Sequence, residues 1–357
     1  MSYGKSASPK HIISFDIETL PDVSLISNLI KADAINSFFN GNCIGSCNDE
    51  NTLSIFKRFA DLVQSLFEDI NVDVSNGVRD KGVINITEDE AKKFVEACDE
   101  WQKCLLIEWY HVFNYKNAFP RQLFHVVHSL SVVYGIVVNG KVEIKKIATI
   151  SRGDLEKIST IDDAIKAEAA IISLFKERVN KLSCNSNDIR FVSFNGSTFD
   201  VPVLKFRAMK NGIAFSSLFG YSMSRYQEGH VDVLDKMRDH NPMINFKLSE
   251  VCAMLNIPCK YSGSGNEVLQ MFKDGNVEGI DRYCEIDALV TFLAYVRFYE
   301  TKGEYVEGSY NAALKSLNDY VVQEKKDGGE MSDIIEFMRL HAEMDDNAKQ
   351  HYALLNS

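Results

Sequence analysis

Three stretches of the chain carry the residue pattern of β-strands. Residues 11–19, "HIISFDIET", form a largely apolar run, and residues 189–195, "IRFVSFN", form a shorter one that predicts a buried strand. Residues 123–150 are rich in β-branched side chains and contain Asn139 followed by Gly140, a dipeptide typical of tight hairpin turns. The sequence therefore predicts one β-hairpin and two further strands.

Between and after these strands, apolar positions recur every three to four residues, as in helices that bury one face. Two such runs, residues 54–70 and 87–113, lie within the segment 22–119, and the second opens with "TEDE", an N-terminal cap pattern. The same periodicity predicts helices over residues 160–182 (capped by Thr160), 199–212 (ended by Gly212), 247–257, 277–300, 308–325 and 331–354. Antiparallel strands followed by a strand between helices predict an α/β fold, with a mixed sheet covered by helices.

The composition is that of a globular protein without a membrane span. The chain has 357 residues, of which 45% are hydrophobic and 25% charged, and no apolar run approaches the roughly 20 residues that cross a bilayer. The first ten residues, "MSYGKSASPK", are polar, so we expect no secretory signal. Eight scattered cysteines favour a reducing, cytoplasmic location. Cys43 and Cys47 have a spacing that zinc sites use, but no second pair follows nearby, so we expect ordinary loop cysteines.

The acidic residues are concentrated in two segments. The formal net charge of −11 argues, by itself, against a polyanionic partner. However, residues 22–119 hold 9 basic and 16 acidic residues and residues 301–357 hold 6 and 11, whereas the remainder holds 24 and 23. The balanced central part is compatible with a locally positive path for a phosphate backbone. We interpret the two acidic segments as solvated helices; the alternative is a surface that docks a protein partner.

Two carboxylates lie next to each other in the first predicted strand. Asp16 and Glu18 are two residues apart, so a strand would place both side chains on one face, where like charges repel. A strand end that emerges into solvent would explain the pair without any function. Alternatively, a divalent cation between the two carboxylates would relieve the repulsion. The pair alone does not decide between these readings.

Two later segments supply further candidate groups. Asp200 follows the buried strand 189–195 and falls in the first turn of the next helix, where the helix dipole by itself favours an acid. Tyr283 and Asp287 are four residues apart on a predicted helix and therefore share a face. Each feature alone is common by chance, so only their combination carries a functional prediction.

The three motifs occur in a fixed order: D-x-E in "FDIETLPD", N-x-x-x-F-D in "FNGSTFDVPVLKFRA" and Y-x-x-x-D in "YCEIDALV". With "RYQEGHVDVLD" and "KLSEVCAMLNIPCK", they resemble the tyrosine branch of the DEDD superfamily of 3′–5′ exonucleases. More closely, they resemble the predicted stand-alone exonucleases related to the proofreading domain of family B DNA polymerases. The resemblance covers residues 11–21 and about 120–300. It implies an RNase H-like domain over 1–21 and 120–300, with a helical insertion, 22–119, and a helical C-terminal extension, 301–357.

The resemblance also implies hydrolysis assisted by two Mg²⁺ or Mn²⁺ ions. By resemblance, Asp16 bridges both ions, Glu18 and Asp287 complete the site that binds the attacking water, and Asp200 holds the second ion through water. Tyr283 orients that water by its hydroxyl. The chemistry agrees with this assignment, because Mg²⁺ prefers hard oxygen ligands and two cations roughly 3.5–4 Å apart stabilise the attacking and leaving oxygens.

Further residues are assigned to the substrate. In similar enzymes the segment equivalent to Thr19, Leu20 and Pro21 touches the 3′-terminal nucleotide, with the leucine between bases; an ordinary strand exit is the alternative. We expect Asn195 and Phe199 to shape their turn and lie against the substrate, although Phe199 would also suit the core.

Other polar residues are expected to act less directly. We expect His230 to make a structural or substrate contact and Asp232 to support the site from behind. Lys205, Arg207 and Lys210 lie on the helix after Asp200 and could meet phosphates, but a solvated helix face is the default expectation.

The leading functional prediction is a metal-dependent 3′–5′ exonuclease that acts on single-stranded DNA ends, as in DNA repair. The chain has no room for a polymerase domain of the usual size, so any proofreading would act in trans. A 3′–5′ exoribonuclease is the alternative enzyme, because recognition of the 2′-hydroxyl depends on pocket shape. A non-catalytic nucleic-acid-binding or scaffold protein with a relic site is the third possibility, although all four acids and the tyrosine are in place.

Overall fold

The computed structural model of the chain describes residues 10–39, 50–66, 86–115, 119–150, 158–182, 188–220, 223–259, 265–329 and 331–353. The chain divides into two compact units, which are described separately. The first comprises residues 1–19, 127–158 and 167–357, and the second comprises residues 20–126 and 159–166. Cys43, Cys47 and the end of the predicted helix 54–70 lie outside the described residues.

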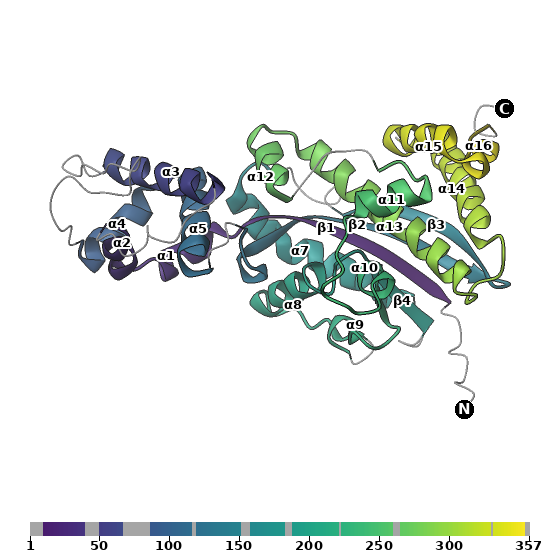
Figure 1. Cartoon of the computed structure of the whole chain (residues 1–357), viewed down its shortest axis with the longest axis horizontal. Helices are drawn as coiled ribbons and strands as arrows, with labels where there is room; N and C mark the ends of the chain where they lie inside the picture. Colours follow the sequence, from purple (N-terminus) through teal and green to yellow (C-terminus); the bar gives the residue numbers. More distant parts are fainter. Residues whose placement is uncertain are drawn as a thin grey trace. The chain divides into compact units, whose positions relative to one another are not determined.

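A five-stranded sheet has the order β3-β2-β1-β4-β5 (Figure 1). Its strands are β1 (His11–Pro21), β2 (His125–Val138), β3 (Lys141–Thr149), β4 (Ile189–Ser193) and β5 (His230–Asp232). β2 and β3 pair antiparallel, whereas β4 pairs parallel with both β1 and β5. This confirms the predicted mixed sheet. β5 was not predicted, because it is only three residues long.

The predicted hairpin joins β2 and β3. Asn139 and Gly140 both have positive φ, 52° and 78°, between the paired residues Val138 and Lys141. Two successive residues with positive φ form a turn whose twist matches that of the flanking strands, and asparagine and glycine adopt this backbone most readily. The turn residues thus fix the register of the hairpin.

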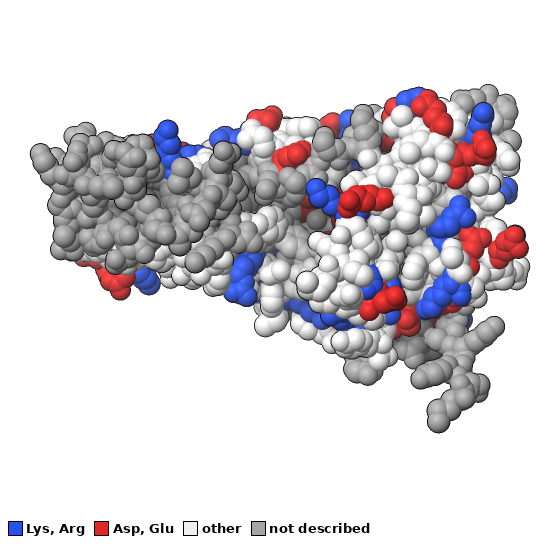
Figure 2. All heavy atoms as spheres, viewed as in Figure 1, with Lys and Arg blue, Asp and Glu red and all other residues white. Residues whose placement is uncertain are grey.

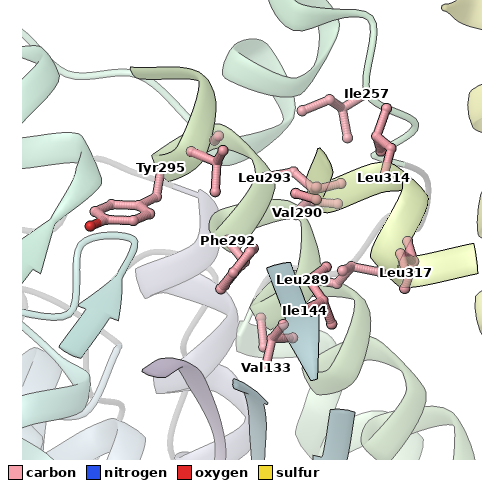
Figure 3. Packing of buried hydrophobic residues seen from close by; sticks show 14 of the residues in the cluster. Val133, Ile144, Ile257, Leu289, Val290, Phe292, Leu293, Tyr295, Leu314 and Leu317 are labelled. Carbon is pink, nitrogen blue, oxygen red and sulfur yellow. The ribbon is translucent and has the colours of Figure 1, made fainter. Parts of the chain in front are cut away.

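Alternate residues of β1 enter two different hydrophobic clusters. Ile13, Phe15 and Ile17 join a cluster that contains side chains of α7 (Ile161–Asn180) and α8 (Asp200–Lys210). On the other face, Ile12 joins a cluster built around α13 (Val277–Thr301) and α14 (Ser309–Lys326). Figure 3 shows how side chains of β2 and β3, such as Val133 and Ile144, meet side chains of these two helices.

The predicted C-terminal helices are part of this packing. Leu314 and Leu317 of α14 are buried in the same cluster as Leu289 of α13 (Figure 3). The predicted run 331–354 is interrupted: α15 (Ser332–Met344) ends before Asp345, whose carboxylate accepts the backbone N–H groups of Asn347 and Ala348 at the start of α16 (Asp346–Ala353). One predicted helix is therefore two.

The second unit is helical over most of its described residues. Its helices are η1 (Val23–Leu25), α1 (Ile26–Leu29), α2 (Ala32–Phe39), α3 (Glu50–Leu66), α4 (Glu88–Ala97), α5 (Glu100–Tyr115) and η3 (Gln122–Phe124). Phe59 of α3 stacks on Trp109 of α5 with ring centroids 4.2 Å apart. The predicted single run 87–113 is wrong, because Asp99 accepts the backbone N–H of Gln102 and starts a new helix there.

Four further helices among the described residues belong to the first unit. They are α9 (Ser216–Phe219), α10 (Val233–Met237), α11 (Leu248–Leu255) and α12 (Gly265–Lys273), of which α9, α10 and α12 were not predicted. No helix among the described residues is long and apolar enough to cross a lipid bilayer. On the face drawn in Figure 2, basic and acidic side chains are intermixed over the described surface.

We predict that Leu289→Ala destabilises the protein by about 2–5 kcal/mol, because Leu289 is fully buried and truncation leaves a cavity. Met254→Ala on α11 is the control, since Met254 is 63% exposed and its truncation leaves no cavity. Urea unfolding of both variants would measure the two losses. Equal losses would contradict the packing described here.

Candidate active site

β1 presents its even-numbered residues to α13. The Ser14 hydroxyl donates a hydrogen bond to the carbonyl oxygen of Ala288 (2.9 Å), and the Cys284 thiol donates one to the carbonyl oxygen of Asp16 (3.3 Å). Because strand side chains alternate between faces, Asp16 and Glu18 lie on the same side of the sheet as Ser14. The pairing of β1 with α13 therefore holds both carboxylates against this helix.

α13 contributes two polar groups to the same place. Tyr283 and Asp287 are one helical turn apart, and the side chain of Tyr283 lowers the pKa of the Asp287 carboxyl. The charges of Asp287, Glu18 and Asp16 all act on Tyr283. The structure thus brings together the first and third sequence motifs, which are more than 260 residues apart in the chain.

The turn between β4 and α8 supplies the fourth carboxylate. Asn195 has a positive φ of 60°, and Gly196 lies so close to Ser193 that a Cβ atom at residue 196 would collide with the Ser193 hydroxyl. A tight turn follows, and Asp200 becomes the first residue of α8. The backbone N–H of Ile17 in β1 is close enough to lower the pKa of Asp200, so this turn lies beside the first motif.

Asp232, at the end of β5, holds the same turn from the other side. Its carboxylate accepts the backbone N–H groups of Asn195 (2.9 Å) and Ser197 (3.0 Å). It also accepts the N–H of Asp235 and caps α10. Asp232 is thus a positioning residue for Asp200, in line with the supporting role predicted for it.

Burial raises the pKa of all four carboxyl groups, and repulsion from neighbouring acids raises it further for Asp16, Glu18 and Asp200. Burial raises the pKa of Asp16 and of Glu18 well above the usual range, and the neighbouring acids raise both further. Burial also raises the pKa of Asp200 and of Asp287 to about 7. Since the groups interact, they titrate as one cluster that retains protons near neutral pH.

The donor set of this cluster fits a hard divalent cation. Four carboxylates are the oxygen ligands that Mg²⁺ and Mn²⁺ prefer. In addition, Oδ2 of Asp16 is shielded from solvent and accepts no hydrogen bond from the described residues. Within the described chain, no three Asp, Glu, His or Cys side chains converge tightly enough to enclose an ion as they stand. The residues that could hold a cation are Asp16, Glu18, Asp200 and Asp287.

The other predicted residues differ in their exposure. Thr19 and Pro21 are half-buried at the end of β1, and Leu20 between them is buried. Asn195 is exposed on the turn, whereas Phe199 is half-buried against the cluster of α7 and α8.

His230 is buried and shares a 2.8 Å hydrogen bond between its Nε2 atom and the Ser193 hydroxyl. Burial lowers the pKa of His230 to about 4, so the ring is neutral near pH 7.

Two residues of the site were not predicted at all, Ser14 and Cys284. The alternation of β1 was the available signal for Ser14, but nothing near Cys284 in the sequence indicates its contact with Asp16.

A sequence model of one family, described as predicted 3′–5′ exonucleases related to the exonuclease domain of PolB, matches residues 117–339. This is more than half of the chain, and the chain belongs to this family. The match includes Asp200, Tyr283 and Asp287 but begins after Asp16 and Glu18. No curated protein is similar enough to the chain to count as a match. The mixed sheet with flanking helices is thus an RNase H-like fold, and the family supports exonuclease activity in general.

We predict that Asp287→Asn changes how stability depends on pH in the presence of EDTA. The folded wild type holds a proton on a carboxyl of pKa about 7, whereas the unfolded chain releases it near pH 4. The wild type therefore loses stability from this group as pH rises from about 4 to 7, and asparagine does not. The variant's gain in melting temperature should grow across this window and then level off.

Asp274→Asn is the control for this experiment, because Asp274 is exposed on the surface near the end of α12. Thermal unfolding of the three proteins between pH 4 and pH 8 makes the comparison. If the melting-temperature difference between Asp287→Asn and wild type stays constant with pH, the raised pKa of Asp287 is contradicted.

Proposed function

We propose that the protein is a metal-dependent 3′–5′ exonuclease that hydrolyses phosphodiester bonds from the 3′ end of single-stranded DNA with two divalent cations. The observation that carries the proposal is the cluster of four carboxyl groups with raised pKa values beside Tyr283. Family membership supports the same reaction class.

In this proposal Asp16, Glu18 and Asp287 would hold one cation, and Asp16 would hold the other with Asp200, which would act through water. Bound Mg²⁺ or Mn²⁺ supplies stabilisation of the negative charge on the attacking and leaving oxygens. The carboxylates position the ions, and Asp16 supplies an oxygen that no protein donor occupies among the described residues. The burial that raises the pKa of these groups also strengthens their attraction for a cation.

Tyr283 is proposed to orient the attacking water. Burial, followed by the charge of Asp287, raises the pKa of Tyr283 above its ordinary value, so its hydroxyl keeps its proton at neutral pH. A protonated phenol positions a water molecule but does not remove its proton. His230 is buried against Ser193, which supports Tyr283 as the residue that faces the water.

The 3′-terminal nucleotide is proposed to lie over the exposed Asn195, beside Phe199 and Thr19. Asn195 precedes Asp200 on the same turn, so a strand that contacts it passes beside the carboxylates. A relic site is disfavoured, because a scaffold protein would gain stability from replacing buried acids that repel one another.

We predict that the purified protein shortens single-stranded DNA only in the presence of Mg²⁺ or Mn²⁺. A 5′-labelled oligonucleotide should give a ladder of products, and a 3′-labelled one should release mononucleotide, because hydrolysis starts at the 3′ end. EDTA should stop both reactions, and circular single-stranded DNA should survive. An RNA of the same sequence, tested in parallel, distinguishes the deoxyribonuclease from the exoribonuclease. Cleavage of the circle would exclude a strict exonuclease.

We predict that Asp16→Ala abolishes hydrolysis, whereas Tyr283→Phe lowers the rate by roughly 10²-fold or less, as expected for the loss of one positioning group. The phenylalanine variant keeps all four carboxylates, so the concentration of Mn²⁺ that gives half-maximal stabilisation should stay near that of the wild type. Rates from labelled oligonucleotides and melting temperatures with Mn²⁺ test both statements. Wild-type activity in Asp16→Ala would remove the proposed site.

A further inference from the structure

A cavity lies next to the turn that carries Asp200. Its volume is about 250 Å³, and its walls come from the turn, α8, the segment before β5 and the end of α10. The lining residues are Ser197, Thr198, Val201, Pro202, Lys205, Met223, Arg225, His230 and Arg238. This volume is below the roughly 300–1,000 Å³ of pockets for drug-sized ligands and suits a smaller group, such as a phosphate with its sugar.

Three of the lining residues are cationic, and their charge is only partly compensated. Arg225 and Arg238 both pair with the buried carboxylate of Asp235. Lys205 is half-buried, and no carboxylate among the described residues forms an ion pair with it. Its ammonium nitrogen lies over the ring of Phe219, 5.7 Å from the ring centroid. His230 is neutral, so the cavity has an excess of positive charge.

The cavity also retains hydrogen-bond donors for an anion. Arg225 donates through Nε and Nη2 to Asp235 and to the carbonyl oxygen of His240. Arg238 donates through Nε to Asp235. The other N–H groups of both guanidinium groups and the ammonium of Lys205 form no hydrogen bond to the described residues. Burial lowers the pKa of Lys205, as is typical of a cation that lacks an acidic partner.

Two aromatic rings are exposed near these cations. Phe219 is 46% exposed beside Lys205, and Tyr226, which follows Arg225 in the chain, is 72% exposed. Proteins that bind single strands combine cations that hold the backbone with aromatic rings on which bases stack. The cavity and its surroundings have both features.

We propose that this cavity is a second phosphate-binding subsite, in which Lys205, Arg225 and Arg238 hold a phosphate of the nucleic acid and Phe219 stacks with a base. The inference rests on the proposed function, because it assumes a single-stranded substrate. The subsite shares the turn 195–200 with the carboxylate cluster. A strand held at this cavity would therefore contact the turn that carries Asp200, independently of the metal ions.

The phosphate has two sources, the backbone of the bound strand or the nucleoside monophosphate released by hydrolysis. Both present the same anionic oxygens to the cations. A phosphate of the strand would raise affinity for longer substrates, whereas a released monophosphate would compete with the strand. The two sources are distinguished by competition.

The test is the binding of a short, fluorescently labelled single-stranded oligonucleotide to the full chain in EDTA, where no metal-dependent hydrolysis occurs. Lys205→Gln should weaken binding about threefold to tenfold and lower the slope of log Kd against log salt by about 0.7, the value for one phosphate contact with a single strand. Lys205→Arg should restore the wild-type slope, because it keeps the charge. Phe219→Leu should weaken binding without changing the slope.

Lys210→Gln is the matched control, since Lys210 is on the same helix, is exposed and does not line the cavity. Competition by a deoxynucleoside monophosphate in wild type but not in Lys205→Gln would identify the product as the ligand. If the monophosphate does not compete, although Lys205→Gln still weakens binding of the strand, the ligand is a phosphate of the strand's backbone. Equal affinities and slopes for Lys205→Gln and Lys210→Gln would overturn the subsite.

The binding experiment in EDTA remains informative if the proposed function fails. A wild-type protein that degrades neither DNA nor RNA would contradict the exonuclease, whereas the loss of binding in Lys205→Gln would still support the subsite. If the exonuclease is confirmed, Lys205→Gln should raise KM for an oligonucleotide about threefold to tenfold and leave kcat near wild type. An unchanged KM would overturn a contribution of the subsite to the reaction.

Discussion

Four carboxyl groups lie together in one poorly solvated site. Holding them there costs electrostatic free energy, and the rest of the site depends on how the fold offsets this cost. Burial raises the pKa of Asp200 and of Asp287 to about 7, and burial with repulsion also raises the pKa of Asp16 and of Glu18 well above the usual range. A fold retains such an arrangement only if the surrounding packing holds the groups in place. A divalent cation would remove the repulsion, which makes a metal-dependent nuclease the simplest account of the cluster.

The packing that holds the cluster consists of a few long-range contacts. The hydrogen bonds from Ser14 to Ala288 and from Cys284 to Asp16 fix β1 against α13. Asp232 fixes the turn that leads to Asp200. Each contact joins backbone to a buried polar side chain, so its loss would leave an unsatisfied group as well as a displaced carboxylate. The groups that do the proposed chemistry and those that position them are therefore different residues.

Local periodicity predicted which residues share a face, but not which elements meet. A spacing of two residues was sufficient to place Asp16 and Glu18 on one face of a strand. A spacing of four was sufficient to place Tyr283 and Asp287 on one face of a helix. The dipeptide Asn139-Gly140 located the hairpin. The partners of β1 on α13 are about 270 residues away, so no local pattern could indicate them. The helix breaks at Asp99 and Asp345 were missed because the apolar periodicity continues across both positions. Each break is set by a side chain that caps the next helix. For Asp99 the signal was present, as Gln102 completes a capping box.

The most direct test of the account is the release of protons when Mn²⁺ binds. Since two carboxyl groups have pKa values of about 7, a cation that binds them near neutral pH must displace protons. Isothermal titration calorimetry at pH 6.5, repeated in buffers with different ionisation enthalpies, counts these protons. The account predicts binding with proton release in the wild type and the loss of both in Asp16→Ala. Binding of Mn²⁺ without proton release, or binding that is unchanged in Asp16→Ala, would contradict it.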